Sequence, residues 1–103
     1  DGIETLIFDE IDTGVSGKIA SYMGDLMLAI SKKTQLISVT HLPQIASKSN
    51  DHLKVSKIID KNGTNTEIKL LNKSERILEI AKLLSGKTIS EAAITNAKEL
   101  LNQ

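Results

Sequence analysis

The stretch LIFDEID, residues 6–12, decides the fold of this chain, because large apolar residues lead directly into adjacent carboxylates. An apolar run of this length predicts a strand over residues 3–11 that is buried on both faces. Open α/β sheets bind their ligands at the carboxyl ends of such strands. Asp9 and Glu10 are therefore expected at a ligand-binding edge of a sheet.

Asp9 and Glu10 together suit metal-assisted phosphate chemistry. One carboxylate can hold Mg²⁺, directly or through water, and its neighbour can take a proton from an attacking water. The alternative is that both residues only end the strand and cap the next helix. The stretch alone leaves both interpretations open.

A second β-rich run, QLISVTH over residues 35–41, also ends in polar groups. One helix-length segment separates the two runs, and strand, helix and strand at this spacing predict a βαβ unit with parallel strands. Both carboxyl ends then lie at one edge of the sheet, so His41 is expected beside Asp9 and Glu10. A lone histidine at a strand end often has only a structural role, which is the alternative for His41.

The first predicted helix follows a small-residue loop over residues 13–17 and runs to about Ser31. After a strand over 35–40, Pro43 is expected to open a short helix that ends near Ser49. The apolar positions of the first helix recur at helical spacing, which predicts one buried stripe. This stripe consists of Ile19, Met23, Leu26, Met27 and Ile30.

A β-hairpin is predicted where Asn62-Gly63 separates two β-rich runs, residues 53–59 and 64–71. In the second run Ile68 and Leu70 alternate with charged residues, so one face of the hairpin is expected to be covered and the other solvated. The lysines near this hairpin are interpreted as solvated surface residues rather than a DNA-binding site. They are Lys54, Lys57, Lys61, Lys69 and Lys73.

Two helices are predicted at the end of the chain. The first is expected from an N-cap at Ser74 to Ser85, with Gly86 as its stop, and the second from about Ser90 onward. Their apolar stripes are interpreted as core or as a partner-docking surface rather than a ligand box. The stripes are Ile77, Ile80, Ala81 and Leu84, then Ala93, Ile94, Ala97, Leu100 and Leu101.

The composition narrows the possible classes of function. The 103 residues make at most one domain, and 40% hydrophobic residues suffice for a globular fold. Phe8 and Tyr22 are the only aromatic residues, which argues against a base-stacking surface. Thirteen basic and thirteen acidic residues cancel, so net charge does not indicate nucleic acid or a membrane as a partner. There is no cysteine and no apolar run long enough to span a bilayer.

The order LIFDEIDTGVSG, one helix, then QLISVTHLPQIAS resembles the C-terminal half of an ABC-type ATPase head, most closely that of the SMC-like RecN family of DNA repair proteins. The resemblance continues through VSK, the NG hairpin, ERILEIAKLLSG and NAKELL, and so covers essentially the whole chain. It implies a partial P-loop NTPase fold, with a parallel βαβ core, a β-hairpin and two C-terminal helices. Residues 1–103 would form the C-terminal lobe of such a head.

The resemblance also implies roles for single residues. Asp9 looks like the Walker B aspartate that holds magnesium, and Glu10 like the catalytic glutamate. His41 looks like the switch histidine that senses the γ-phosphate. The D-loop, which crosses the dimer interface and contributes to nucleotide binding, would comprise Thr13, Gly14, Val15 and Ser16.

The chain departs from the general ABC pattern in two residues and two motifs. Ser16 stands where the D-loop usually ends in Asp, and Leu42 where an Asp often follows the switch histidine. No Walker A loop and no ABC signature segment is present in these 103 residues. Because the chain opens at Asp1-Gly2 without Met, it is expected to be a cut piece of something longer. Without those two motifs it is expected to hydrolyse little or no ATP alone. An exposed sheet edge and exposed apolar helix faces would lead it to self-associate or swap strands.

In the complete head, the resemblance implies ATP and Mg²⁺ as cofactors. The implied partners are the N-terminal half of the same head, a second head in a homodimer and, through the full-length protein, DNA. The expected location is the bacterial cytoplasm, at the nucleoid and without membrane association.

Two other classes of function stay open from the sequence. Asp9, Glu10 and Asp12 could form a stand-alone magnesium site for phosphodiester or phosphoryl transfer, as in Toprim-like nucleases. An acidic residue on a neighbouring strand end would favour such a site, but the second strand ends in Thr40-His41. The third possibility is a non-enzymatic module that docks partners through its two C-terminal helices.

Overall fold

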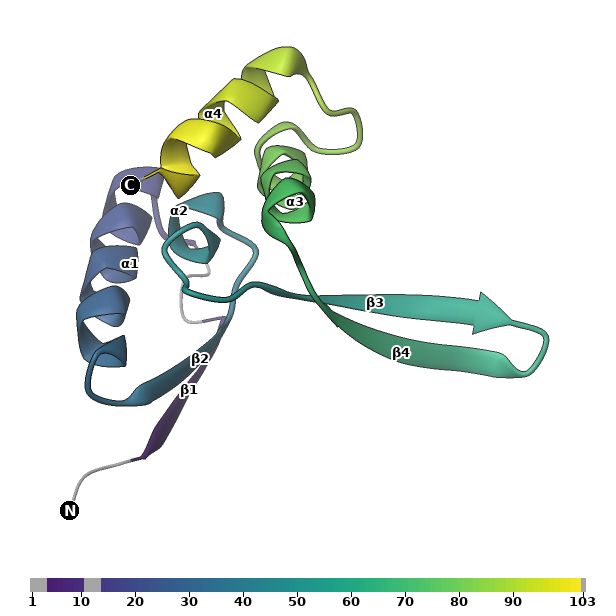
Figure 1. Cartoon of the computed structure of the whole chain (residues 1–103), viewed down its shortest axis with the longest axis horizontal. Helices are drawn as coiled ribbons and strands as arrows, with labels where there is room; N and C mark the ends of the chain where they lie inside the picture. The colour runs from purple at the N-terminus through teal and green to yellow at the C-terminus, as the bar shows by residue number, and fades with distance from the viewer. Residues whose placement is uncertain (1–3, 11–13, 103) are drawn as a thin grey trace.

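A computed structural model describes residues 4–10 and 14–102 as an α/β arrangement with a projecting hairpin (Figure 1). The order of elements agrees with the predicted order, and the boundaries differ by a few residues. The elements are β1 (Thr5–Asp9), α1 (Gly17–Ser31), β2 (Gln35–Val39), α2 (Pro43–Ala46), β3 (Leu53–Asp60), β4 (Gly63–Leu70), α3 (Lys73–Ser85) and α4 (Glu91–Leu101).

The βαβ unit is the part that positions the predicted site. β1 and β2 pair in parallel, from Thr5 opposite Gln35 to Asp9 opposite Val39. The helix α1 connects them and lies against one face of the pair, where Phe8 packs on its buried residues. The predicted parallel βαβ core is therefore confirmed.

The opposite face of this strand pair is exposed, so the prediction that the first strand is buried on both faces is wrong. Ile7 is 67% exposed, Ile37 45% and Val39 49%. These side chains alternate with the ones that face α1, as the pleat of a strand requires. None of the described elements covers this second face.

The buried stripe of α1 differs from the predicted one. Ala20, Gly24 and Met27 are buried, whereas Ile19 is 54% and Leu26 63% exposed. The reason is the close approach of α2. A methyl group added at Gly24 would lie 3.0 Å from the carbonyl oxygen of Gln44, so only a very small residue fits on this side of α1.

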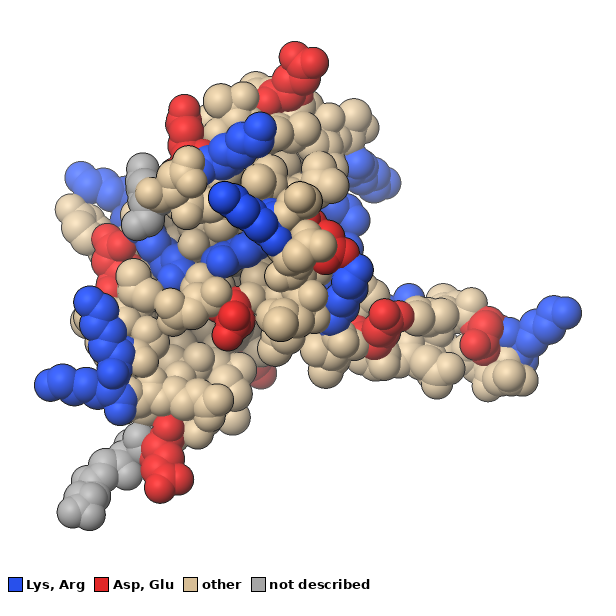
Figure 2. Space-filling view, in the orientation of Figure 1, with Lys and Arg blue, Asp and Glu red and all other residues tan. Residues whose placement is uncertain are grey.

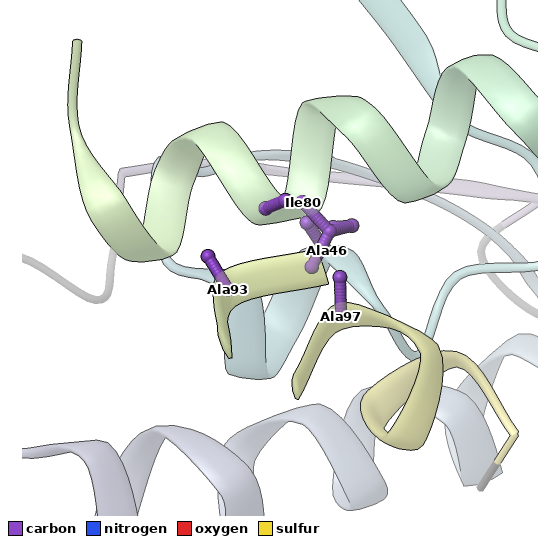
Figure 3. Packing of buried hydrophobic residues seen from close by; sticks show 5 residues of the cluster. Ala46, Ile80, Ala93 and Ala97 are labelled. Atoms are coloured by element: carbon purple, nitrogen blue, oxygen red, sulfur yellow. The ribbon is translucent and has the colours of Figure 1, made fainter. Parts of the chain in front are cut away.

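A second core joins α2 to the two C-terminal helices. Ala46 of α2 packs among buried side chains of α3 and α4 (Figure 3). Small alanines on α4 let these helices pack closely around Ile80, which is fully buried. The predicted apolar stripes of both helices are confirmed as core. Its buried members are Ala46, Ile80, Ala81, Ala93 and Ala97.

The N-cap of α3 is Asn72, so the prediction of Ser74 is wrong. The Asn72 side chain accepts a hydrogen bond of 2.8 Å from Glu75 N, and Glu75 Oε1 accepts one of 3.0 Å from Asn72 N. This reciprocal capping box satisfies two backbone donors, which Ser74 inside the first turn cannot do. The helix α4 begins at Glu91, close to the predicted start near Ser90, and Ser90 caps it by accepting a hydrogen bond of 3.1 Å from Ala93 N.

The hairpin β3–β4 is antiparallel, and its two loop residues are Lys61 and Asn62. Gly63, which opens β4, has a φ of +118°, a conformation that favours glycine. The hairpin extends away from the helices (Figure 1). This projection explains a radius of gyration of 14.8 Å, against about 13 Å for an ordinary domain of this length.

The apolar face of the hairpin is exposed, so the prediction that one face is covered is wrong for this chain. Val55 and Ile68 face each other across the strands and are 64% and 65% exposed. The polar face lies toward α3 instead, where Lys54 forms an ion pair of 3.0 Å with Glu79. The hairpin is held to α3 by its charged residues and offers its apolar residues outward.

Candidate functional site

The carboxyl ends of β1 and β2 bring together the polar residues that follow each strand. Asp9 is the last residue of β1 and lies opposite Val39, the last residue of β2. The pairing continues for one step, because Glu10 N donates a hydrogen bond of 2.9 Å to the Val39 carbonyl oxygen. His41 follows Val39 by two residues. The structure thus places Asp9, Glu10 and His41 after neighbouring strand ends, and their catalytic roles stay predictions.

Glu10 has a left-handed backbone, with a φ of +52°. A non-glycine residue in this region carries strain of the order of 1 kcal/mol, and such residues gather at functional sites. This conformation turns the chain at the end of β1, directly after Asp9. Both residues are exposed. No pattern in the sequence predicts this conformation at Glu10.

The predicted D-loop lies between β1 and α1. Thr13 is outside the described residues. Gly14 has a φ of +78°, which favours glycine, and half-buried Val15 packs against the residues beneath α1. Ser16 is the N-cap of α1, with its side-chain oxygen 3.5 Å from Ile19 N. Ser16, where the general ABC pattern usually has Asp, therefore caps the start of the helix.

The segment around His41 is fixed on both sides. Thr40 Oγ1 accepts a hydrogen bond of 3.0 Å from Leu42 N. Leu42 packs into the core beneath α1, and Pro43 occupies the first turn of α2, as predicted. His41 itself is exposed. The loop thus holds its backbone and leaves the imidazole accessible to a ligand.

Arg76 of α3 anchors the far end of α2, which sequence reasoning did not foresee. Its Nη2 lies 3.1 Å from the Ala46 carbonyl oxygen, 2.6 Å from that of Ser49 and 3.0 Å from Ser49 Oγ. A cation at the C-terminal end of a helix satisfies carbonyl groups that have no partner within the helix. The ERILEIAKLLSG segment contained this arginine, but its spacing alone could not reveal a partner about thirty residues away.

His52 follows the same segment and is half-buried. Burial, and then the positive charge of Arg76, lower the pKa of His52 below the ordinary 6.5. Its Nδ1 is buried without a hydrogen-bond partner among the described residues. His52 therefore lies near Arg76 and Glu79 of α3, one residue before β3 begins.

The alternative metal site gains no further ligand from the structure. No group of three or more His, Asp or Glu side chains within residues 4–10 and 14–102 could hold a metal ion. Asp12, which that alternative needs, is outside the described residues. The adjacent strand β2 leads into Thr40 and His41, so Asp9 and Glu10 meet no carboxylate there.

The lysines of the hairpin do not form a continuous basic surface. Lys54 and Lys69 pair with Glu79 and Glu75 of α3. Figure 2 shows acidic side chains beside basic ones along the hairpin. This distribution agrees with the interpretation of these lysines as solvated surface residues. Across the described ranges, no helix has both the length and the apolar character to cross a bilayer.

Comparison with known sequences identifies relatives over almost the entire chain, although no protein-family model matches it. It is 44% identical over 100 residues to DNA repair protein RecN of Haemophilus influenzae and 44% identical over 98 residues to that of Rickettsia conorii. It is 37% identical over 101 residues to DNA repair protein RecN of Bacillus subtilis. These alignments cover 97%, 95% and 98% of this chain. The chain spans 18% of the length of each of these relatives.

A solved structure from a study of ATP-driven dimerization and DNA-stimulated activation of SMC ATPases shares the fold, with a TM-score of 0.69. The match covers 85% of this chain and 52% of that one, at 17% sequence identity. This likeness confirms the predicted fold class, an α/β fold that corresponds to part of a P-loop NTPase fold. The chain therefore corresponds, over nearly all of its length, to one segment of the RecN family.

Proposed function

We propose that this chain is the C-terminal part of the ATP-binding and ATP-hydrolysing head of a RecN-type protein that acts in DNA double-strand break repair and recombination. The observation that supports this most strongly is the edge formed by β1 and β2. Asp9 and Glu10 leave one strand at the point where the neighbouring strand leads to His41. The fold around this edge is similar to part of a solved structure from a study of SMC ATPases, which supports the proposal.

The chemistry of the three side chains fits phosphoryl transfer to water. Mg²⁺ prefers carboxylate oxygens, and Asp9 would hold it, where the ion neutralises phosphate charge. Glu10 would orient the attacking water and accept its proton. His41 would donate a hydrogen bond to the γ-phosphate, where negative charge develops. All three residues are exposed, as an incomplete half of a shared site would be.

The remaining part of the head is the first proposed partner. The second face of the β1–β2 pair and the apolar face of the hairpin are both exposed, with Ile7 and Val55 among their residues. An upstream segment of the same protein would cover these faces and bring the phosphate-binding loop and its lysine. The match to only 52% of the SMC ATPase chain supports this division.

A second head and DNA are the further proposed partners. The D-loop segment over residues 13–16 would contact the second head of a homodimer, and the full-length protein would bind DNA. A complex that acts on DNA in bacteria would reside in the cytoplasm, at the nucleoid. As an isolated chain, this part would hydrolyse little or no ATP, because it lacks the groups that hold the phosphates.

The test is Glu10→Gln in the full-length protein, which keeps the shape of the side chain and removes its basicity. ATP turnover should fall at least about a hundredfold, as expected when a general base is lost, while ATP binding persists. Glu4→Gln is the matched control, because Glu4 is exposed and precedes the opposite end of β1. Unchanged turnover in Glu10→Gln would refute the proposal.

A further inference from the structure

Residues beside Asp9, beside His41 and within the predicted D-loop all pack on one apolar cluster. Its buried centre is Ala20, Met27 and Ile45, beneath α1 and α2. Phe8, which precedes Asp9, packs on this centre, and so does Leu42, which follows His41. The remaining contacts of this kind include Val15, from the predicted D-loop.

A second contact connects the same two loops through Gln44. This residue lies in α2, three positions after His41, and its side chain reaches Gly17, the first residue of α1. A methyl group added at Gly17 would lie 3.3 Å from Gln44 Nε2 and 3.8 Å from its Cδ. Gly17 directly follows Ser16, the last residue of the predicted D-loop. The residue that follows the predicted D-loop therefore lies close to a side chain from the His41 segment.

We propose that Leu42 and Gln44 are positioning residues, which set the D-loop segment 14–16 in register with the loop that carries His41. This inference rests on the proposed function, because it assigns a task to residues around the same site. Neither side chain needs to touch nucleotide. Leu42 packs on the same cluster as Val15, and the Gln44 side chain lies close to Gly17, so a displacement of the His41 loop would be passed to residues 14–17.

Close packing would allow these contacts to pass a displacement from the His41 loop to the D-loop segment. Interiors at native density transmit displacements, because few voids exist to absorb them. The helices α1 and α2 approach closely at Gly24, where even an added methyl group would lie 3.0 Å from the Gln44 carbonyl oxygen, so little space remains for them to move closer together. The side-chain amide of Gln44 therefore makes the polar contact between the two loops, and Leu42 makes the apolar one. The presence of Leu42, where the general pattern often has Asp, agrees with a packing role.

The test is a double-mutant cycle with Gly17→Ala and Gln44→Ala in the full-length protein. Each single variant should lower kcat about tenfold, because displacements near 1 Å at a reacting centre cost up to about a hundredfold, while the KM for ATP stays within about twofold. In the double variant the alanine at position 17 no longer meets Gln44, so the two losses should be strongly non-additive. Additive effects would overturn the inference.

A matched pair of cavity variants separates positioning from simple destabilisation. Leu42→Ala and Leu84→Ala remove the same group, from the cluster under α1 and from the one between α2, α3 and α4. Only Leu42→Ala should lower kcat, and Leu42→Met should restore it. Equal loss in both variants would overturn the inference. Glu10→Gln is measured alongside these variants. If ATP turnover survives Glu10→Gln, the proposed function itself is refuted. If Glu10→Gln abolishes turnover but the effects of Gly17→Ala and Gln44→Ala are additive, only the positioning role is refuted.

Discussion

Replacing Gly24 with alanine measures how tightly α1 packs on α2. Inside a helix this change is normally stabilising by about 1 kcal/mol, because glycine loses more backbone entropy on folding. Here the added methyl group would lie 2.9 Å from Lys48 Cγ, 3.0 Å from the Gln44 carbonyl oxygen and 3.6 Å from Ile45 Cα. The gain in propensity and the steric cost therefore oppose each other.

The steric cost should decide the sign. The Gln44 oxygen belongs to the backbone of α2, which is buried and anchored by Arg76. Lys48 is held at its far end, where its Nζ lies 2.9 Å from Asp25 Oδ1. Overpacking typically costs about 1–3 kcal/mol. Subtracting the propensity gain leaves a net destabilisation of about 1 kcal/mol, or a melting temperature about 4–8 °C lower for a domain of this size.

Thermal unfolding of the chain, followed by far-ultraviolet circular dichroism, is the assay. Ala29→Gly is the matched control, because Ala29 is exposed in the same helix and reports the propensity difference alone. That control should be destabilised by about 1 kcal/mol. A Gly24→Ala variant that melts above the parent would refute the argument, because it would show that α2 yields freely to the added methyl group.

Three further changes test the contacts between α3 and its neighbours. Arg76→Leu should lower the free energy of unfolding by about 2–4 kcal/mol in urea denaturation. The two N–H groups of Nη2 can make at most two charged hydrogen bonds, to acceptors such as the Ala46 and Ser49 carbonyl oxygens. A loss below about 0.5 kcal/mol would contradict that role. Because the pKa of His52 is lowered in the folded chain, the unfolded chain binds more protons than the folded chain below pH 6.5, and stability should fall as pH drops through that value. His52→Gln should therefore flatten the dependence of the urea midpoint on pH. An unchanged slope would contradict this role of His52. Asn72→Ala should cost about 1 kcal/mol through loss of the capping box, measured by thermal unfolding.

Local patterns in the sequence predicted the elements and the edge of the sheet. The apolar run before Asp9 and the β-rich run before His41 were sufficient for two parallel strands, because their spacing admits one crossover helix. Asn62-Gly63 was sufficient for a hairpin. These signals are local, so they can be recognised even in a chain that spans 18% of the length of its RecN relatives.

Burial was harder to predict, because it depends on what lies opposite each face. Ile7, Val55 and Ile68 are apolar in the sequence and were expected to be covered, yet no described element covers them. The buried face of α1 differs from the predicted one because α1 lies close to the backbone of α2 at Gly24. Periodicity cannot reveal such a contact between separate segments. The left-handed Glu10 was missed because glutamate has no preference for that conformation.

The most direct test of the central claim is ATP turnover on mixing this chain with the separately produced upstream part of the head, which carries the phosphate-binding loop. The account predicts that neither part alone hydrolyses ATP, that the mixture does, and that Glu10→Gln abolishes this turnover without preventing the two parts from associating. If the two parts form a stable complex and no ATP is hydrolysed, or if turnover survives Glu10→Gln, the claim that Asp9, Glu10 and His41 complete a shared ATPase site is contradicted.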